Sequence, residues 1–306
     1  MPVLTRRSLA ALLWVIGAGV FAAFVVVVGW RPIADALANA HVGKLTGMSL
    51  VTVAALWLRV YKWRIALGPA PGAIPLFWMS KAAGEFSPGR VGELSPLLLK
   101  RYRTPRIAAW IVLDRVLEMT ATIGLGVAGI LLIRVPNQTT AILAASLISF
   151  SMLAALYLMS KRALFEWLAA WAGSESRIGR ALLFFAEAGS EIRAFRGAMP
   201  GAMVITLIAG FADVWAGMLL YSAFGTHVSF ALMAAVKGLH AITSAIPLTP
   251  NATGVPYLTA AVLLHEVGGV SSEVLIAAIA VAVAITNIVF WLSALAAAPS
   301  LRSANF

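Results

Sequence analysis

The sequence predicts an all-α polytopic membrane protein, with about six transmembrane helices and two re-entrant helical hairpins in an inverted-topology repeat. Of its 306 residues, 61% are hydrophobic and only 11% are charged, and the mean hydropathy is +0.92. Soluble domains are about 45–50% apolar and about 25% charged, so both fractions indicate a protein of the bilayer. The composition excludes a soluble enzyme, a disordered chain and a nucleic-acid-binding protein.

Six apolar runs are long enough to cross the bilayer, which requires about 20 residues of helix. The first run, Leu9–Trp30, follows two arginines and exceeds the usual signal-peptide core of about 7–15 residues, so we interpret it as a signal anchor. The other five are Leu45–Leu67, Ile107–Ile133, Thr139–Met159, Met199–Phe224 and Val274–Ala298.

Two further apolar stretches are interrupted by Gly and Pro. Residues 74–99 are broken at 84–93, Gly-Glu-Phe-Ser-Pro-Gly-Arg-Val-Gly-Glu, and residues 228–267 are broken at 247–256, Pro-Leu-Thr-Pro-Asn-Ala-Thr-Gly-Val-Pro. Gly and Pro at this density end a continuous helix, and irregular backbone at membrane depth is stable only where protein or water covers it. We therefore expect two half-helices to meet at each break, forming a re-entrant hairpin.

Lysines and arginines fix the predicted orientation of the spans. Sixteen of them fall at cytoplasmic ends, Arg59 and Lys62 among them, whereas only Arg31, Lys44 and Arg134 fall on the outer side. Cytoplasmic loops are enriched in basic residues, so this bias puts both termini in the cytoplasm. It also accounts for the net charge of +11 without a nucleic-acid partner.

The chain divides into two units on either side of a connector. Residues 161–197 form the connector, where apolar residues recur at helical spacing with charged residues between them, which predicts an amphipathic helix at the cytoplasmic surface. Residues 45–134 and 199–298 each run span, broken hairpin, span, but in opposite directions through the membrane. Together these parts make residues 1–306 a single integral membrane domain. Broken segments at matching positions of two inverted halves indicate a transport site near the midplane.

Ionisable residues at membrane depth are costly and are therefore functional candidates. The first group, Glu85, Arg90 and Glu93, surrounds the first break. Arg90 and Glu93 come at the start of the returning half-helix, where free N–H groups and the planar fork of an arginine suit a phosphate. The alternative is that Arg90 and Glu93 only pair with each other and cap the helix.

A second group of charges, Asp114, Arg115 and Glu118, lies on one face of a predicted span. At 100° per residue the three fall within about 100° of arc, and Glu118 lies roughly 16 Å along the helix, near mid-bilayer. Such residues must face the protein interior. They either line a path or carry protons, or else form a structural ion network that holds the span to the first hairpin.

Other polar residues give weaker indications. Asn251 and Thr253 precede the second returning half-helix, where they would cap it or contact a ligand. Asp213 and Lys237 are single charges, and one hypothesis is that they pair; His240 is either a proton relay or a packing histidine. The chain has no cysteine, no metal-ligand pattern and no Walker loop, so neither a metal nor a cofactor is expected.

The motifs resemble those of the lysylphosphatidylglycerol synthase transmembrane family. Residues 90–93, Arg-Val-Gly-Glu, match its R-x-G-E signature, and residues 114–118, Asp-Arg-Val-Leu-Glu, are similar to its E-R-x-x-x-D with the acids exchanged. Residues 247–254 keep both prolines and the last glycine of P-x-x-P-G-G-x-G. The double glycine of that motif is Asn-Ala here, and Tyr257 stands where the family has Glu.

The resemblance implies a flippase-like protein of the bacterial cell inner membrane, similar to the lipid-flipping domain of the multiple peptide resistance factor. We expect a lipid flippase, not an enzyme, that moves a phosphate-bearing lipid of the phospholipid or polyprenyl-phosphate type. The expected partner is a lipid with an anionic headgroup, with a homo-oligomer or a biosynthetic enzyme as further partners. The expected substrate-binding residues are Glu85, Arg90, Glu93, Asp114, Arg115, Glu118, Asn251 and Thr253.

Two alternatives come from other functional classes. One is a membrane-embedded transferase, or its accessory subunit, acting on polyprenyl-phosphate sugars. The other is a passive membrane scaffold. A transferase should carry paired carboxylates for a metal ion facing an aqueous pocket, and no such spacing occurs in the loops. A scaffold would have no need of charges at mid-bilayer.

Overall fold

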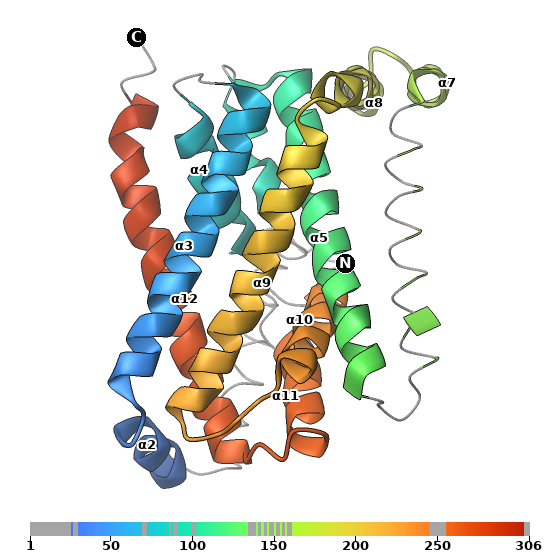
Figure 1. Cartoon of the computed structure of the whole chain (residues 1–306). Coiled ribbons are helices and arrows are strands. Elements are labelled where there is room, and N and C mark those ends of the chain that lie inside the picture. The colour runs from blue at the N-terminus through green and yellow to red at the C-terminus, as the bar shows by residue number, and fades with distance from the viewer. Residues whose placement is uncertain are drawn as a thin grey trace, which may run out of the picture.

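The computed structural model describes residues 30–68, 72–85, 91–99, 102–133, 161–244 and 255–302, with isolated residues between these ranges. Within these ranges the chain is helical and contains no strand, as the sequence predicts (Figure 1). The predicted spans Leu9–Trp30 and Thr139–Met159 lie almost wholly outside the described residues. The total number of spans therefore stays a prediction.

Four long helices run side by side through the molecule (Figure 1). They are α3 (Val42–Leu67), α5 (Pro105–Ile133), α9 (Met199–Ala223) and α12 (Ser272–Arg302). By length and composition, α5, α9 and the Ser272–Phe290 part of α12 can each cross a membrane. Helix α3 follows α2 (Trp30–Ala38) at a bend of 85°, and this bent pair counts as a fourth span. The described chain is thus a helical membrane protein with three or four candidate spans.

Both interrupted stretches have a helical arm on each side of the break. The first consists of α4 (Ala73–Glu85) and η1 (Val91–Leu98), which pack together. The second consists of α10 (Phe230–Ser244) and α11 (Val255–Glu266), also in contact. In Figure 1, α4 lies in the upper part of the bundle and the second hairpin in the lower part. The returning arm η1 differs from the expected α-helix: it is a 3-10 helix that contains Pro96, which has no N–H for the α-helical ladder.

Glycine and serine residues bring the two arms of the first hairpin together. A Cβ on Gly92 would lie 2.0 Å from the carbonyl oxygen of Ala83, so only glycine fits at this backbone contact. The hydroxyl of Ser87 accepts a hydrogen bond from the N–H of Gly92 at 2.6 Å and donates one to the carbonyl of Gly84 at 3.1 Å. The R-x-G-E glycine therefore has a structural role in the turn.

A close helix crossing holds the second hairpin against α5. A Cβ on Gly126 of α5 would lie 2.5 Å from the Cα of Gly238 on α10, and a Cβ on Gly129 would lie 2.3 Å from the carbonyl oxygen of Ala231. Small residues allow such backbone contact between helices in a membrane. The crossing fixes α10 on α5.

The first hairpin is held instead by large aromatic side chains. Trp63 of α3 is fully buried and makes edge-to-face contacts with Phe77 of α4 and Trp110 of α5, at centroid distances of 5.6 Å and 6.5 Å. On its other side α4 contacts α12 through Trp78 and Phe290, at 5.8 Å. Edge-to-face pairs are a favourable geometry for buried rings.

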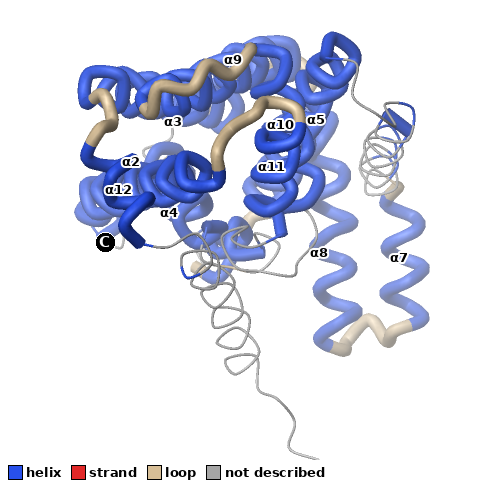
Figure 2. The backbone as a smooth tube through the Cα atoms, turned by 90° about the horizontal axis from the view of Figure 1, so that it is seen from below, coloured by secondary structure: helices blue, strands red, loops and turns tan. Residues whose placement is uncertain are grey.

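The connector contains two main helices where one was predicted. They are α7 (Arg162–Trp171) and α8 (Arg177–Glu191), followed by a short 3-10 helix, η3 (Ile192–Phe195). The chain turns between them at Gly173, whose φ of 81° favours glycine. Both helices are amphipathic, as expected. Viewed along the bundle, they lie side by side and project beyond its outline (Figure 2).

Candidate functional site

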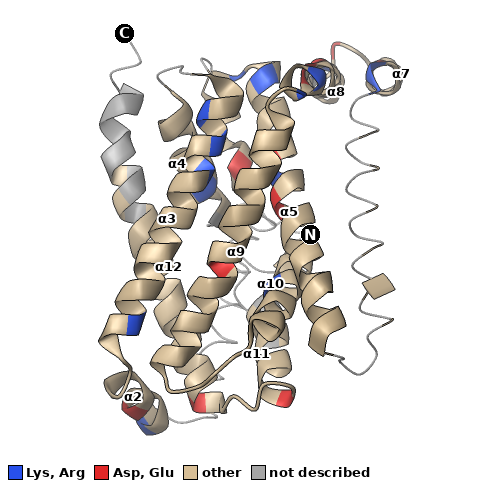
Figure 3. Ribbon diagram, in the orientation of Figure 1, with Lys and Arg blue, Asp and Glu red and all other residues tan. Residues whose placement is uncertain are grey.

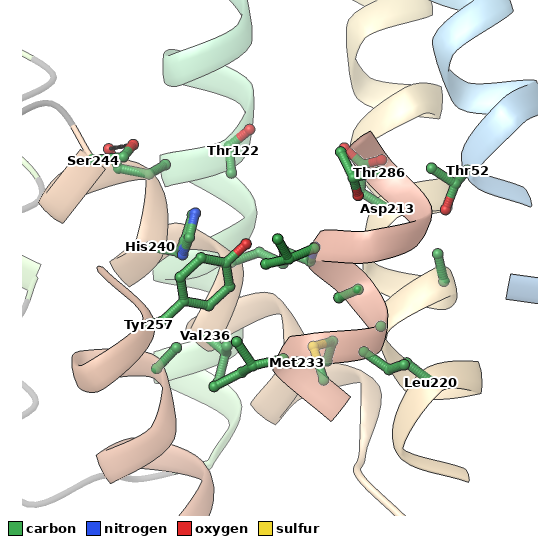
Figure 4. Close-up of a pocket in the computed structure, with 18 of the residues that line it drawn as sticks. Thr52, Thr122, Asp213, Leu220, Met233, Val236, His240, Ser244, Tyr257 and Thr286 are labelled. Atoms are coloured by element: carbon green, nitrogen blue, oxygen red, sulfur yellow. Dashed lines mark hydrogen bonds between the residues drawn. The ribbon is translucent and has the colours of Figure 1, made fainter. Parts of the chain in front are cut away.

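A cavity of about 340 Å³, lined by both apolar and polar side chains, lies within the bundle (Figure 4). Residues from seven helices line it: α3, α4, α5, α9, α10, α11 and α12. Its charged lining residues are Arg59, Lys81, Arg115, Glu118, Asp213 and Lys237, and its other polar residues include Thr52, Thr122, His240, Ser244, Tyr257, Thr286 and Asn287. Four of the six charged residues are basic, so the wall favours an anionic group.

One side of the cavity is built on a buried ion network. Lys62 of α3, which is fully buried, lies 2.6 Å from Asp114 of α5 and 3.4 Å from Glu118. Lys81 of α4 lies 3.1 Å from Asp114, 2.9 Å from Glu118 and 3.7 Å from Glu93 of η1. The network therefore joins α3, the first hairpin and α5. Burying a charge is tolerated when several opposite charges surround it, as they do here.

Arg59 extends the network across the cavity to α9. Its guanidinium lies 2.5 Å from a carboxylate oxygen of Asp213 and 3.4 Å from Glu118. Glu118 thus contacts three cations, and its side chain is 13% exposed, which opens it to the cavity. Figure 3 shows the basic segments of α3 and the acidic segments of α5 and α9 between the helix ends, within the bundle.

The second hairpin forms the opposite wall of the cavity. On α10 the lining residues follow helical spacing: Met233, Val236, Lys237, His240, Ala241 and Ser244. His240 and Tyr257 of α11 point toward each other in Figure 4, with ring centroids 5.1 Å apart and the planes at 66°. This wall carries aromatic and hydroxyl groups with a single full charge, Lys237.

The structure brings together part of the predicted site. Asp114 is buried in the interior, as predicted, and Arg115 and Glu118 lie on the cavity wall. Glu93 is buried beside Lys81. Substrate binding by these residues stays a prediction.

The structure does not bring the remaining predicted residues into the described site. Glu85 is the last residue of α4. Arg90, Asn251 and Thr253 fall outside the described residues.

Three basic residues of the site were missed in the sequence. Arg59 and Lys62 were counted only as orientation signals at cytoplasmic ends, whereas the structure also places both in the buried network. Lys81 was overlooked within the first apolar stretch. Their positions in the sequence could have identified them, because each lies more than one helical turn inside a predicted apolar stretch. A basic residue at membrane depth is a functional candidate for the same reason as an acidic one.

The hypothesis that Asp213 pairs with Lys237 is also wrong. Asp213 pairs with Arg59. In the part of the chain that the structure describes, Lys237 makes neither an ion pair nor a hydrogen bond. The same ranges contain no group of three His, Asp or Glu residues placed to hold a metal ion.

These features define a polytopic helical membrane protein with a charged cavity enclosed by two helical hairpins. The sequence model of one family, described as the lysylphosphatidylglycerol synthase TM region, matches residues 14–294. The chain belongs to this family, as its motifs indicated. Searches of curated proteins and of solved structures find no match to the chain.

Proposed function

We propose that the chain is a lipid flippase that moves a phosphate-bearing lipid between the leaflets of the cytoplasmic membrane, and that it is not an enzyme. The observation that carries this proposal is the cavity, whose charged wall has four basic and two acidic residues. Its volume of about 340 Å³ falls in the range of about 300–1,000 Å³ typical of small-molecule sites. Membership of a lipid-related membrane family supports the same conclusion.

The arrangement of helices supports the proposal of an inverted repeat. Helices α3 to α5 would form one unit and α9 to α12 the other, with α3 and α9 packed against each other. Helix α4 of the first hairpin packs against α12, as α10 of the second hairpin packs against α5. Inverted repeats place a transported substrate between the two units. In the proposed topology the two hairpins enter from opposite sides and both termini are cytoplasmic.

In this proposal the headgroup crosses through the cavity while the lipid tails stay in the bilayer. The guanidinium of Arg59 and the ammonium of Lys81 would donate hydrogen bonds to phosphate oxygens, which are strong because both partners are charged. Glu118 and Asp213 contact these cations in the structure. An entering phosphate would compete with these carboxylates for the two cations.

The proposal is tested with the full chain reconstituted in phosphatidylcholine vesicles that contain fluorescent phosphatidylglycerol. Dithionite quenches only the outer leaflet, so the quenched fraction measures transbilayer movement. We expect movement faster than in protein-free vesicles, slowed by Arg59→Gln, with the lipid chemically unchanged by mass spectrometry. Movement equal to that of empty vesicles for phosphatidylglycerol and for a polyprenyl phosphate would contradict a flippase. A new lipid product would indicate the transferase alternative.

A further inference from the structure

Lys237 forms no ion pair with the other charged residues of the cavity that the structure describes. It lies on the stripe of α10 that lines the cavity, and its side chain is partly buried. The acidic residues of the wall already contact basic residues elsewhere. Glu118 contacts Arg59 and Lys81, and Asp213 contacts Arg59. Lys237 has no ionic or hydrogen-bonding partner among the described residues. An uncompensated ammonium at membrane depth is costly, so it indicates an anionic ligand.

Among the described side chains of the site, basic residues outnumber acidic ones. The described basic residues of the cavity and network are Arg59, Lys62, Lys81, Arg115 and Lys237; the acidic ones are Glu93, Asp114, Glu118 and Asp213. These side chains leave an excess of one positive charge. A phosphodiester supplies one negative charge, whereas a diphosphate supplies more.

We propose that Lys237, together with His240 and Tyr257, binds the phosphodiester of an anionic phospholipid. This inference rests on the proposed function for the source of the ligand. The ammonium has three donors, and the imidazole of His240 and the phenol of Tyr257, which line the same cavity, are further hydrogen-bonding groups. His240 follows Lys237 by one helical turn on the same face, and Tyr257 faces His240 from α11 (Figure 4).

The backbone under this binding site is held in place. Gly238, the residue after Lys237, is in contact with Gly126 of α5, where a Cβ would come within 2.5 Å of backbone. This contact holds the backbone of α10 that carries Lys237 at the cavity wall. A backbone held in place lowers the ordering cost of binding.

The test is a binding measurement on the purified full chain in detergent, with phosphatidylglycerol as the lipid probe and inorganic phosphate as the soluble probe. Lys237→Gln should weaken phosphatidylglycerol binding by about tenfold or more, since one charged hydrogen-bond donor is lost. Lys237→Arg should retain most of the binding. Lys44→Gln is the matched control, because Lys44 is also partly buried but contacts Ser222 at the far end of α3, and it should bind as the wild type does.

Folding is checked by thermal unfolding, where Lys237→Gln should melt no lower than the wild type because it removes no described partner. Equal phosphatidylglycerol binding by Lys237→Gln and the wild type would overturn the inference. If inorganic phosphate bound as tightly as the lipid, the proposal that the ligand is a lipid would be overturned. If a polyprenyl diphosphate bound more tightly than phosphatidylglycerol, the proposal that the ligand carries a single negative charge would be overturned.

The binding test separates this inference from the proposed function, because it needs no transport. Binding that depends on Lys237 without transbilayer movement would support the inference and contradict the flippase. Transbilayer movement that is equally fast in Lys237→Gln and the wild type would contradict the inference and support the flippase.

Discussion

The two hairpins share a helical plan but differ in how their charges are compensated. The first hairpin and its flanking helices carry a closed network, with Lys62 and Lys81 surrounded by Asp114, Glu118 and Glu93. The second hairpin carries one charge on the cavity wall, Lys237. The difference teaches that the fold does not require a buried network in each half. The charges of the first hairpin network hold helices together, whereas Lys237 of the second hairpin is open to a ligand.

The hairpins also differ in how they pack. The first is fixed by Trp63, Phe77 and Trp110 through ring contacts, and the second by the backbone contact of Gly126 with Gly238. The two hairpins should therefore respond differently to substitutions of their charges and of their packing residues.

The largest effect is expected from Lys62→Ala, which leaves Asp114 buried without its nearest cation. Removing one partner of a buried pair costs about 3–5 kcal/mol, so we expect a lower yield and a lower melting temperature by tryptophan fluorescence. Lys62→Met with Asp114→Leu should recover much of the loss, because both charges are removed. Lys237→Ala is the counterpart in the second hairpin and should not destabilise. Equal losses for Lys62→Ala and Lys237→Ala would break the comparison.

The next effect concerns helix packing. Gly126→Ala places a methyl group on the backbone of Gly238, and we expect a loss of about 1–3 kcal/mol from overpacking. Gly124→Ala is the control on the same helix, because a Cβ there meets nothing within 4 Å. It should be neutral or slightly stabilising, since alanine favours helix. Thermal unfolding of both variants checks this, and a stable Gly126→Ala would show that the crossing tolerates separation.

An effect on stability that is no larger than this is expected from neutralising carboxylates of the wall. Glu118→Gln keeps the shape but weakens three ionic contacts, and should cost about 1–3 kcal/mol. Asp213→Asn should cost less, because its side chain is 32% exposed and loses one contact. Both should slow transbilayer movement of phosphatidylglycerol, Glu118→Gln more. The reverse order would place the centre of the site at α9.

The smallest effect on stability comes from single cysteines at the surface, which test the opposite entry of the hairpins. The chain has no native cysteine, so Arg103→Cys, Arg180→Cys and His227→Cys each carry one thiol. Exposed substitutions usually change stability by less than about 0.5 kcal/mol. We expect impermeant maleimide to label positions 103 and 180 only from the cytoplasm and position 227 only from outside. Labelling of 103 and 227 from one side would contradict the proposed inverted topology.

Local signals in the sequence predicted the helices well. Apolar runs of about 20 residues identified α3, α5, α9 and α12, and clusters of Gly and Pro located both hairpin breaks. Both signals are local, because each affects only the backbone within a few residues of it. The i, i+4 spacing of Asp114 and Glu118 was enough to expect both in the interior. The sequence predicted one connector helix instead of the two observed, since the glycine turn at 173 is a single residue in an otherwise periodic segment.

The partners within the site could not be predicted in this way. Lys62 is 56 residues from Glu118 in sequence, and Lys81 is 37 residues from it. Such contacts depend on how helices pack, which hydropathy does not encode. The positive-inside rule gives no indication that Arg59 and Lys62 belong to the site, because it counts basic residues near span ends without asking whether the bundle buries them.

The contact between Gly126 and Gly238 has a mechanical consequence for any cycle in which the cavity faces first one side and then the other. With backbone against backbone, we expect α5 and α10 to move together. The matching seam between α4 and α12 is made by the rings of Trp78 and Phe290, which can change rotamer while the helices shift. The contact between α5 and α10 would then stay fixed while the aromatic contact between α4 and α12 opens. A headgroup would therefore enter beside α4 and α12.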